Sequence, residues 1–230
     1  MIDKIRAIFT IVQMMITVSF IIILMYIFRK NNSKKIRQMW SKYQMKLIGI
    51  TLDIEGELDN EADMLIMNHQ SLLDIVILEY LHKKDLVWVA KKEIFNLFWF
   101  GHVVKAPKMI AVERESKTSL VKLLKDVKEQ LNHNRVISIF PEGTRTDGKK
   151  LRKFKVGAKL IAEKNNLTVQ PIVIIGSREI LDSQKMKHKP GTVKIVFLPT
   201  VKAERKTHWY KDTEEKMNEI LNKELSKNDI

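Results

Sequence analysis

The sequence predicts an α/β protein with a mostly parallel or mixed central sheet of about seven strands flanked by helices, preceded by an N-terminal two-helix membrane-binding segment. Three observations support this prediction. From residue 51 onward, short apolar runs alternate with runs of helical periodicity. The runs at 135–140 and 168–175 are apolar without alternation, which is typical of strands covered on both faces. Before residue 51 come an uncharged run and a basic amphipathic run.

The apolar runs set the expected elements in order along the chain. Strands are expected at residues 51–55, 63–67, 86–90, 109–113, 135–140, 168–175 and 192–198. Helices are expected at residues 72–81, 94–104, 117–132, 155–164 and 208–226. The clearest helix is 117–132, because its leucines and valines recur on one face. We expect residues 1–50 to form a membrane-associated helical segment and residues 51–230 to form one α/β domain.

Residues 8–28 form an uncharged apolar run whose helical length, about 32 Å, matches the hydrocarbon core of a bilayer. Arg29 and Lys30 follow it where a cleaved signal peptide would have small residues. We favour a membrane-spanning helix. The alternative is a helix that dips into one leaflet, because Gln13 and several hydroxyl residues lower the hydrophobicity of the run.

Residues 33–50 read as a basic amphipathic helix. Trp40 and Tyr43 suit the headgroup layer, and lysines and arginines, Arg37 among them, occupy the other positions and suit anionic lipid. The alternative is a surface helix that packs its apolar stripe on the domain. The position directly after a run of membrane length favours the membrane interface.

The composition limits the classes of partner and of chemistry. The chain has a formal net charge of +14 and no cysteine. The charge calls for an anionic partner, which could be nucleic acid, a membrane surface or a phosphorylated substrate. The lack of cysteine excludes disulfides, thiolate metal sites and a cysteine nucleophile.

His69 and Asp74 stand where the apolar strand at 63–67 gives way to an apolar helix. Five residues of continuous helix advance by about 500°, which would place the two side chains about 140° apart. His69 must therefore lie on the connecting turn to reach Asp74. A carboxylate there would fix the imidazole tautomer and stabilise the imidazolium that forms on proton uptake. The competing interpretation is that Asp74 and Ser71 form a helix-capping box.

A second polar stretch, Glu142 to Arg145, follows the strand at 135–140. Gly143 permits close backbone approach to a ligand, Thr144 offers a hydroxyl, and Arg145 offers a guanidinium fork shaped for phosphate. Glu142 would repel phosphate, so we expect it to hold Arg145 or to accept a hydrogen bond from a substrate hydroxyl. An ordinary turn with solvated side chains is the alternative.

Lys91 and Arg114 each follow a predicted strand, so both can reach the sheet edge where the two loops lie. Together with Arg145 they would bind a phosphomonoester through charge-assisted hydrogen bonds.

The pattern Asn68-His69-x-x-x-x-Asp74 followed by the block at 140–145, FPEGTR, resembles the glycerolipid acyltransferase family, and within it the bacterial 1-acylglycerol-3-phosphate acyltransferases. Blocks at 110–114, 154–158 and 169–173 are also similar to those of the family. The resemblance covers residues 51–175. Glu113 stands where the family usually has aspartate.

The resemblance implies transfer of a fatty acyl group from an acyl thioester, acyl-ACP or acyl-CoA, to the 2-hydroxyl of lysophosphatidic acid. The product is phosphatidic acid, for phospholipid biosynthesis. His69 would be the general base and Asp74 the orienting carboxylate. No cofactor and no metal are implied. The residues expected to bind substrate are Lys91, Arg114, Glu142, Gly143, Thr144 and Arg145.

The implied location is the cytoplasmic face of the bacterial inner membrane, because the acceptor is a membrane lipid and the thioester donor is cytosolic. Positive residues after the first helix agree with that side. The expected partners are lysophosphatidic acid, an acyl thioester with acyl carrier protein as a candidate carrier, and anionic headgroups. Nucleic acid is not among them.

Two other functions stay open. The acceptor could be glycerol-3-phosphate, another lysophospholipid or an amino-acid lipid. A protein of another class, a tethered binder of anionic lipid or nucleic acid, would also use the charge. No helix-turn-helix, zinc-finger or stacking-aromatic pattern favours the nucleic-acid binder.

Overall fold

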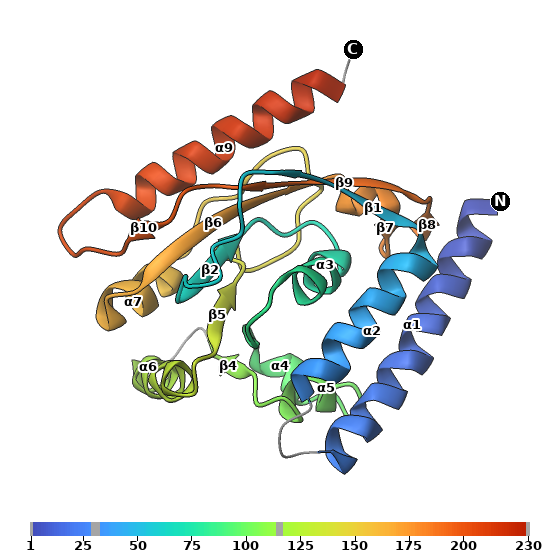
Figure 1. Cartoon of the computed structure of the whole chain (residues 1–230), viewed down its shortest axis with the longest axis horizontal. Helices are drawn as coiled ribbons and strands as arrows, with labels where there is room; N and C mark the ends of the chain where they lie inside the picture. Colours follow the sequence, from blue (N-terminus) through green and yellow to red (C-terminus); the bar gives the residue numbers. More distant parts are fainter. Residues whose placement is uncertain (1, 29–32, 114–116, 229–230) are drawn as a thin grey trace.

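A mixed eight-stranded sheet forms the centre of the molecule in the computed structural model, which describes residues 2–28, 33–113 and 117–228 (Figure 1). Its order is β1-β9-β6-β2-β5-β3-β4, with β10 also paired to β6. The strands of this sheet are β1 (Ile50–Glu55), β2 (Met64–Met67), β3 (Leu86–Lys91), β4 (Ile110–Val112), β5 (Val136–Ile139), β6 (Thr168–Ile175), β9 (Gly191–Phe197) and β10 (Val201–Lys202).

The predicted fold class is confirmed. The neighbours β6-β2-β5-β3-β4 and the pair β1·β9 run parallel, whereas β9 and β10 pair antiparallel with β6. All seven predicted strands are present, each within one residue of its predicted ends. The short hairpin β7 (Leu181–Asp182) and β8 (Lys187–His188), like β10, was not predicted.

Helices cover both faces of the sheet (Figure 1). Alternate residues of β2 enter two different cores: Met64 and Ile66 face one, and Leu65 and Met67 face the other. Burial on both faces explains why β2 is apolar throughout. The helices are α1 (Ile2–Ile27), α2 (Ser33–Ile48), α3 (Leu73–Leu81), α4 (Lys92–Phe95), α5 (His102–Lys105), α6 (Lys117–Asn132), α7 (Val156–Asn165), α8 (Ser177–Ile180) and α9 (Trp209–Asn228).

The single helix predicted at 94–104 is wrong, because this segment forms the two short helices α4 and α5 with a turn between them. Gly101 closes the turn. A Cβ atom at position 101 would lie 2.4 Å from the carbonyl oxygen of Leu97 and 2.5 Å from that of Phe95. Only glycine fits such close backbone approach, so the chain reverses here. The other predicted helices are present as α3, α6, α7 and α9.

Helix α1 lies along the domain over most of its length. By length and composition alone it could cross a membrane. Near its start, the hydroxyl of Thr10 is 2.9 Å from Nδ1 of His188, and near its end the hydroxyl of Tyr26 is 2.6 Å from Nδ1 of His102. If α1 spanned a bilayer, the domain surfaces in contact with it would lie in hydrocarbon, where the N–H and C=O groups of loop backbone would have no hydrogen-bond partners. Packing along the domain therefore favours the alternative of a helix that lies in one leaflet, and the choice between the two stays a prediction.

Helix α2 packs against α3 with part of its polar side, contrary to prediction. Arg37 is 5% exposed and pairs with Glu79 at 3.4 Å and Asp85 at 2.5 Å. The indole of Trp40 donates to the hydroxyl of Thr17 on α1 at 3.0 Å. These two side chains therefore attach α2 to the protein, while Met39 and Tyr43 stay 72% and 52% exposed, so contact of α2 with a membrane stays a prediction.

Candidate active site

The carboxyl ends of β2, β5 and β3 meet at one edge of the sheet because these strands are parallel neighbours. His69 lies in the turn between β2 and α3, and the loop that begins at Phe140 follows β5. The turn and the loop predicted to carry the chemistry therefore lie side by side. This edge is where open α/β sheets place their ligands.

The structure brings His69 and Asp74 into contact. Nδ1 of His69 lies 2.7 Å from Oδ2 of Asp74. The Asp74 carboxylate is fully buried, and the His69 side chain keeps 14% of its exposure. Among the described residues, none forms a hydrogen bond with Nε2 of His69. A carboxylate on Nδ1 places the proton there, so Nε2 can accept one.

Asp74 also holds the turn itself. Its Oδ2 accepts hydrogen bonds from the backbone N–H groups of Gln70 at 2.7 Å and Ser71 at 2.9 Å, and its Oδ1 accepts one from the hydroxyl of Ser177 at 2.5 Å. The orienting and helix-start interpretations of Asp74 therefore both apply. Ser71 also contributes to the helix start, because its Oγ accepts from the N–H of Leu73 at 3.4 Å while its hydroxyl donates to the carbonyl of Leu181 at 2.8 Å.

Asn68 fixes the end of β2 in a way that sequence reasoning missed. Its amide nitrogen donates to the carbonyl of Ile174 at 2.8 Å, and its amide oxygen accepts from the N–H of the same residue at 2.7 Å. The side chain thus continues the β2·β6 ladder after the backbone has turned away. The only sequence signal was the position of Asn68 directly before His69.

Glu142 anchors the backbone of the site instead of Arg145, which corrects our expectation. Its Oε1 accepts from the N–H of His69 at 2.8 Å, and its Oε2 accepts from the N–H of Arg152 at 2.8 Å. The residue is 2% exposed. Burial raises the pKa of Glu142 to about 7, and the two backbone hydrogen bonds act in the opposite direction.

Thr146 holds the other side of the His69 peptide. The carbonyl oxygen of His69 accepts from the N–H of Thr146 at 2.9 Å and from its hydroxyl at 3.2 Å. Arg178 in turn donates to the carbonyl of Thr146 at 2.5 Å and pairs with Asp182 at 2.9 Å. The loop after β5 therefore fixes the His69 turn through its backbone.

Phe140 packs flat on the imidazole. The ring centroids of Phe140 and His69 are 3.8 Å apart with an interplanar angle of 14°, and Trp88 stacks on Phe140 at 5.3 Å. This stack fixes the plane of the imidazole, while Asp74 fixes its rotation. The sequence showed these aromatic residues without indicating the contact.

The remaining predicted residues occupy several positions around the His69 turn. Lys91 ends β3, two strands from β2 on the β5 side. Arg145 is half-buried, and its Nη1 donates to the hydroxyl of Ser183 at 3.2 Å, beside the β7–β8 hairpin that follows β6. No contact joins Lys91 to Arg145 among the hydrogen bonds and ion pairs of the described residues, so the cluster stays a prediction. Arg114 lies outside the described residues.

Gly143 and Thr144 shape the loop between Glu142 and Arg145. Gly143 has a φ of 70°, and its N–H donates to the carbonyl of Phe140 at 2.9 Å, which closes a tight turn. Thr144 is half-buried. Within the described ranges, no group of three or more histidine, aspartate or glutamate side chains could hold a metal ion.

A family model described as Acyltransferase matches residues 49–175. The chain belongs to the acyltransferase family. It is 37% identical over 94% of its length to the 1-acyl-sn-glycerol-3-phosphate acyltransferase of Helicobacter pylori strain J99, covering 92% of that protein. It is 32% identical over 59% of its length to the lyso-ornithine lipid O-acyltransferase of Rhizobium meliloti, covering 48% of that protein.

The fold of this acyltransferase is also similar to a crystal structure of PlsC, the 1-acyl-sn-glycerophosphate acyltransferase of Thermotoga maritima. The TM-score is 0.76 at 17% identity, covering 99% of this chain and 96% of that one. At this identity the likeness concerns the fold alone. It includes the N-terminal helices, because nearly the whole chain aligns.

The buried Glu142 carboxyl makes the stability of the acyltransferase depend on pH. Its pKa rises from the ordinary value of 4.5 to about 7 in the folded chain, so the folded state binds the proton more tightly than the unfolded state. The free energy of unfolding should therefore fall between about pH 4.5 and 7, by up to about 3 kcal/mol from this group. Urea unfolding at a series of pH values measures this change.

Glu142→Gln should lose that share of the pH dependence, because glutamine does not titrate. It should also be less stable at every pH, since one amide oxygen replaces two carboxylate acceptors. Glu215→Gln, on the exposed side of α9, is the matched control and should keep the wild-type profile. A Glu142→Gln profile parallel to the wild type would show that burial of this carboxyl does not control the pH dependence.

Proposed function

We propose that this acyltransferase transfers a fatty acyl group from an acyl thioester to the 2-hydroxyl of lysophosphatidic acid and so makes phosphatidic acid. The observation that carries the proposal is the 2.7 Å contact between His69 Nδ1 and Asp74 Oδ2. It leaves Nε2 of His69 without a partner among the described residues. An alcohol is a weak nucleophile at neutral pH, so the transfer needs a positioned base. The relative from Helicobacter pylori supports this acceptor.

The proposed reaction needs no covalent enzyme intermediate. Nε2 of His69 takes the proton of the acceptor hydroxyl as its oxygen forms a bond to the thioester carbonyl carbon. The tetrahedral intermediate then collapses, the carbon–sulfur bond breaks, and the leaving thiolate takes the proton back from the imidazolium. Buried Asp74 stabilises the imidazolium while it exists.

Arg145, on the loop after β5, is the candidate residue for binding the phosphate of the acceptor. One of its N–H groups is used by Ser183, which holds the guanidinium in place and leaves other donors for a phosphate oxygen. We assign Lys91 the same role as a prediction, and Arg114, which lies outside the described residues, keeps the role expected from the sequence. Holding the phosphate would position the 2-hydroxyl near His69.

The outward face of α1 supports action at a membrane. Large apolar side chains there are exposed while the opposite side packs on the domain, so the helix can enter one leaflet lying along the protein. We place the enzyme on the cytoplasmic face of the inner membrane, where acyl-CoA and acyl carrier protein are available as donors. Anionic headgroups would attract the net charge of +14.

A second candidate acceptor is a lyso-ornithine lipid, favoured by the relative from Rhizobium meliloti. This amino-acid lipid has no phosphate, so it gives Arg145 no phosphomonoester to bind. Acyl transfer to lysophosphatidic acid should therefore depend on Arg145, whereas transfer to a lyso-ornithine lipid should not.

The test is the rate of acyl transfer to each acceptor, with acyl-CoA and with acyl-ACP as donors. Lysophosphatidic acid should be the preferred acceptor. Arg145→Gln should raise its KM about 10- to 100-fold, because a charge-assisted hydrogen bond contributes about 1.5–3 kcal/mol. Arg152→Gln, in the same loop, is the matched control. Preference for lyso-ornithine lipid, or an unchanged KM in Arg145→Gln, would contradict the proposal.

A further inference from the structure

The turn between α4 and α5 exposes large apolar side chains to water. Phe98 is 97% exposed, and Leu97, Ile94 and Trp99 beside it are 51%, 38% and 37% exposed. A fully exposed phenylalanine at the tip of a turn contributes nothing to the core. Clustered exposed apolar residues of this kind mark an interaction surface.

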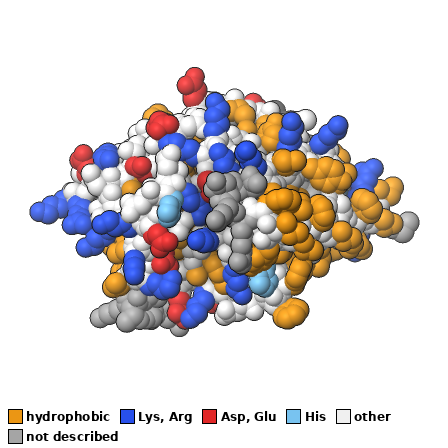
Figure 2. All heavy atoms as spheres, turned by 60° about the horizontal axis from the view of Figure 1, so that its bottom comes forward, with side chains coloured by type: hydrophobic (Ala, Val, Ile, Leu, Met, Phe, Trp, Pro, Cys, Tyr) orange, Lys and Arg blue, Asp and Glu red, His pale blue; other side chains and the backbone are white. Residues whose placement is uncertain are grey.

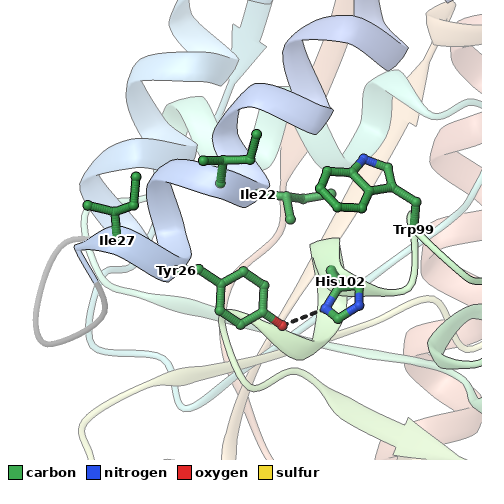
Figure 3. A pocket seen from close by; sticks show the side chains of 6 residues that line it. Ile22, Tyr26, Ile27, Trp99 and His102 are labelled. Carbon is green, nitrogen blue, oxygen red and sulfur yellow. Dashed lines mark hydrogen bonds between the residues drawn. The ribbon is translucent and has the colours of Figure 1, made fainter.

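Two hydrogen bonds fix this turn to α1. The indole N–H of Trp99 donates to the hydroxyl of Ser19 at 2.8 Å, and the hydroxyl of Tyr26 lies 2.6 Å from Nδ1 of His102. Figure 3 shows Tyr26 and His102 pointing toward one another from α1 and α5, with Trp99 beside them. The turn and the helix therefore present one continuous surface.

An open apolar groove of about 440 Å³ lies between the turn and α1. It has room for part of a lipid acyl chain, since ligand pockets range over about 300–1,000 Å³. The residues that line it are Ile22, Ile23, Tyr26, Ile27, Trp99 and His102.

The apolar surface continues along α1 and ends at basic residues. Ile16, Phe20 and Ile27 on α1 are 65%, 60% and 65% exposed. Figure 2 shows hydrophobic side chains gathered on the side of the molecule where α1 lies, with lysines and arginines along the edge of this patch and over the rest of the face. Lys105 and Lys108 are exposed close to the turn in sequence. An apolar surface with a basic border fits a leaflet that contains anionic phospholipid.

The position of the turn in the fold connects this surface to the catalytic edge. The turn follows the carboxyl end of β3, which is the neighbour of β5, and β5 is the neighbour of β2. His69 and the loop that begins at Phe140 follow β2 and β5 at the same edge. A membrane in contact with the turn would therefore lie at the edge where the acceptor must arrive.

We propose that residues 94–99 form a second membrane-inserting element, in which Phe98 enters the leaflet and the groove beside α1 takes an acyl chain of a bilayer phospholipid. This proposal rests on the proposed function in one respect: both require a membrane at this edge of the sheet. It does not depend on which lysolipid accepts the acyl group. Gly101 keeps the turn in the shape that presents Phe98 outward.

The chain has no cysteine, so a single cysteine can carry an environment-sensitive fluorophore. In full-length Phe98→Cys, labelled with a nitrobenzoxadiazole dye, vesicles of phosphatidylglycerol and phosphatidylcholine should shift the emission to the blue. Lipids with a spin label on the acyl chain should quench it. The control Glu215→Cys, on α9 at the opposite side of the molecule in Figure 1, should show neither change.

The second measurement is vesicle co-sedimentation with the unlabelled protein. Phe98→Ser should bind vesicles about tenfold or more weakly than wild type, whereas Val121→Ser, which removes a 71% exposed apolar side chain from α6, should bind normally. Both variants should keep wild-type turnover on detergent-dispersed lysolipid, which separates this proposal from the proposed function.

Two outcomes would overturn the insertion of this turn. In the first, the protein sediments with vesicles while the dye at position 98 shows no shift and no quenching. In the second, the emission shifts without vesicles as protein concentration rises, which would assign the surface to a second copy of the chain.

Discussion

His69→Ala should lower kcat for acyl transfer by about 10²–10⁴-fold. The reason is that Nε2 of His69 lies at the carboxyl edge of the parallel strands with no partner among the described residues, while Nδ1 is held by Asp74 at 2.7 Å. Without the imidazole, the acceptor hydroxyl must lose its proton to water. Initial rates of phosphatidic acid formation at saturating acceptor measure the loss.

The matched control is His208→Ala, which removes an exposed imidazole. It should keep the wild-type rate. His69→Ala should still sediment with vesicles, because the surface of α1 is unchanged. A His69→Ala enzyme that keeps more than about a tenth of the wild-type rate would exclude His69 as the base.

Asp74→Asn should lower kcat by a similar factor with little loss of stability. The amide oxygen of asparagine can take the place of Oδ2, which accepts from Gln70 and Ser71, and the amide N–H can donate to the hydroxyl of Ser177. The contacts of the turn are therefore kept. The negative charge that stabilises the imidazolium is lost, and an amide fixes the ring tautomer less firmly.

Asp74→Ala provides the contrast. It leaves the same donors without an acceptor in a fully buried position, so it should lower the free energy of unfolding by several kcal/mol as well as activity. Urea unfolding and kcat measured on both variants separate the two roles of Asp74. Equal stability loss in the asparagine and alanine variants would show that the charge itself holds the turn.

The strands and the His69–Asp74 contact could be predicted because their signals are local. Apolar runs without alternation marked β5 and β6, a short apolar run marked β2, and the helical angle argument required His69 to lie on a turn. The two-residue strands β7, β8 and β10 could not be found this way, since no period is visible over two residues. The turn at Gly101 was missed because its requirement comes from backbone contacts within the folded segment.

The long-range contacts of the site lay beyond sequence reasoning. Glu142 supports the peptide of His69, 73 positions earlier in the chain, and Ser177 bonds to Asp74 across 103 positions. Arg37 was expected at the lipid surface because its neighbours in sequence are basic. Its partners Glu79 and Asp85 belong to a distant segment, and only the packing of α2 on α3 brings them together.

The nitrogen-15 NMR signals of His69 in labelled full-length enzyme test the central claim most directly. The signals can be assigned by their absence in His69→Ala. With the ring neutral, the contact with Asp74 predicts a proton on Nδ1 and a bare Nε2 that can accept the proton of the lipid hydroxyl. A proton found on Nε2 would contradict the proposed chemistry, because that nitrogen would then donate a hydrogen bond where it must accept one.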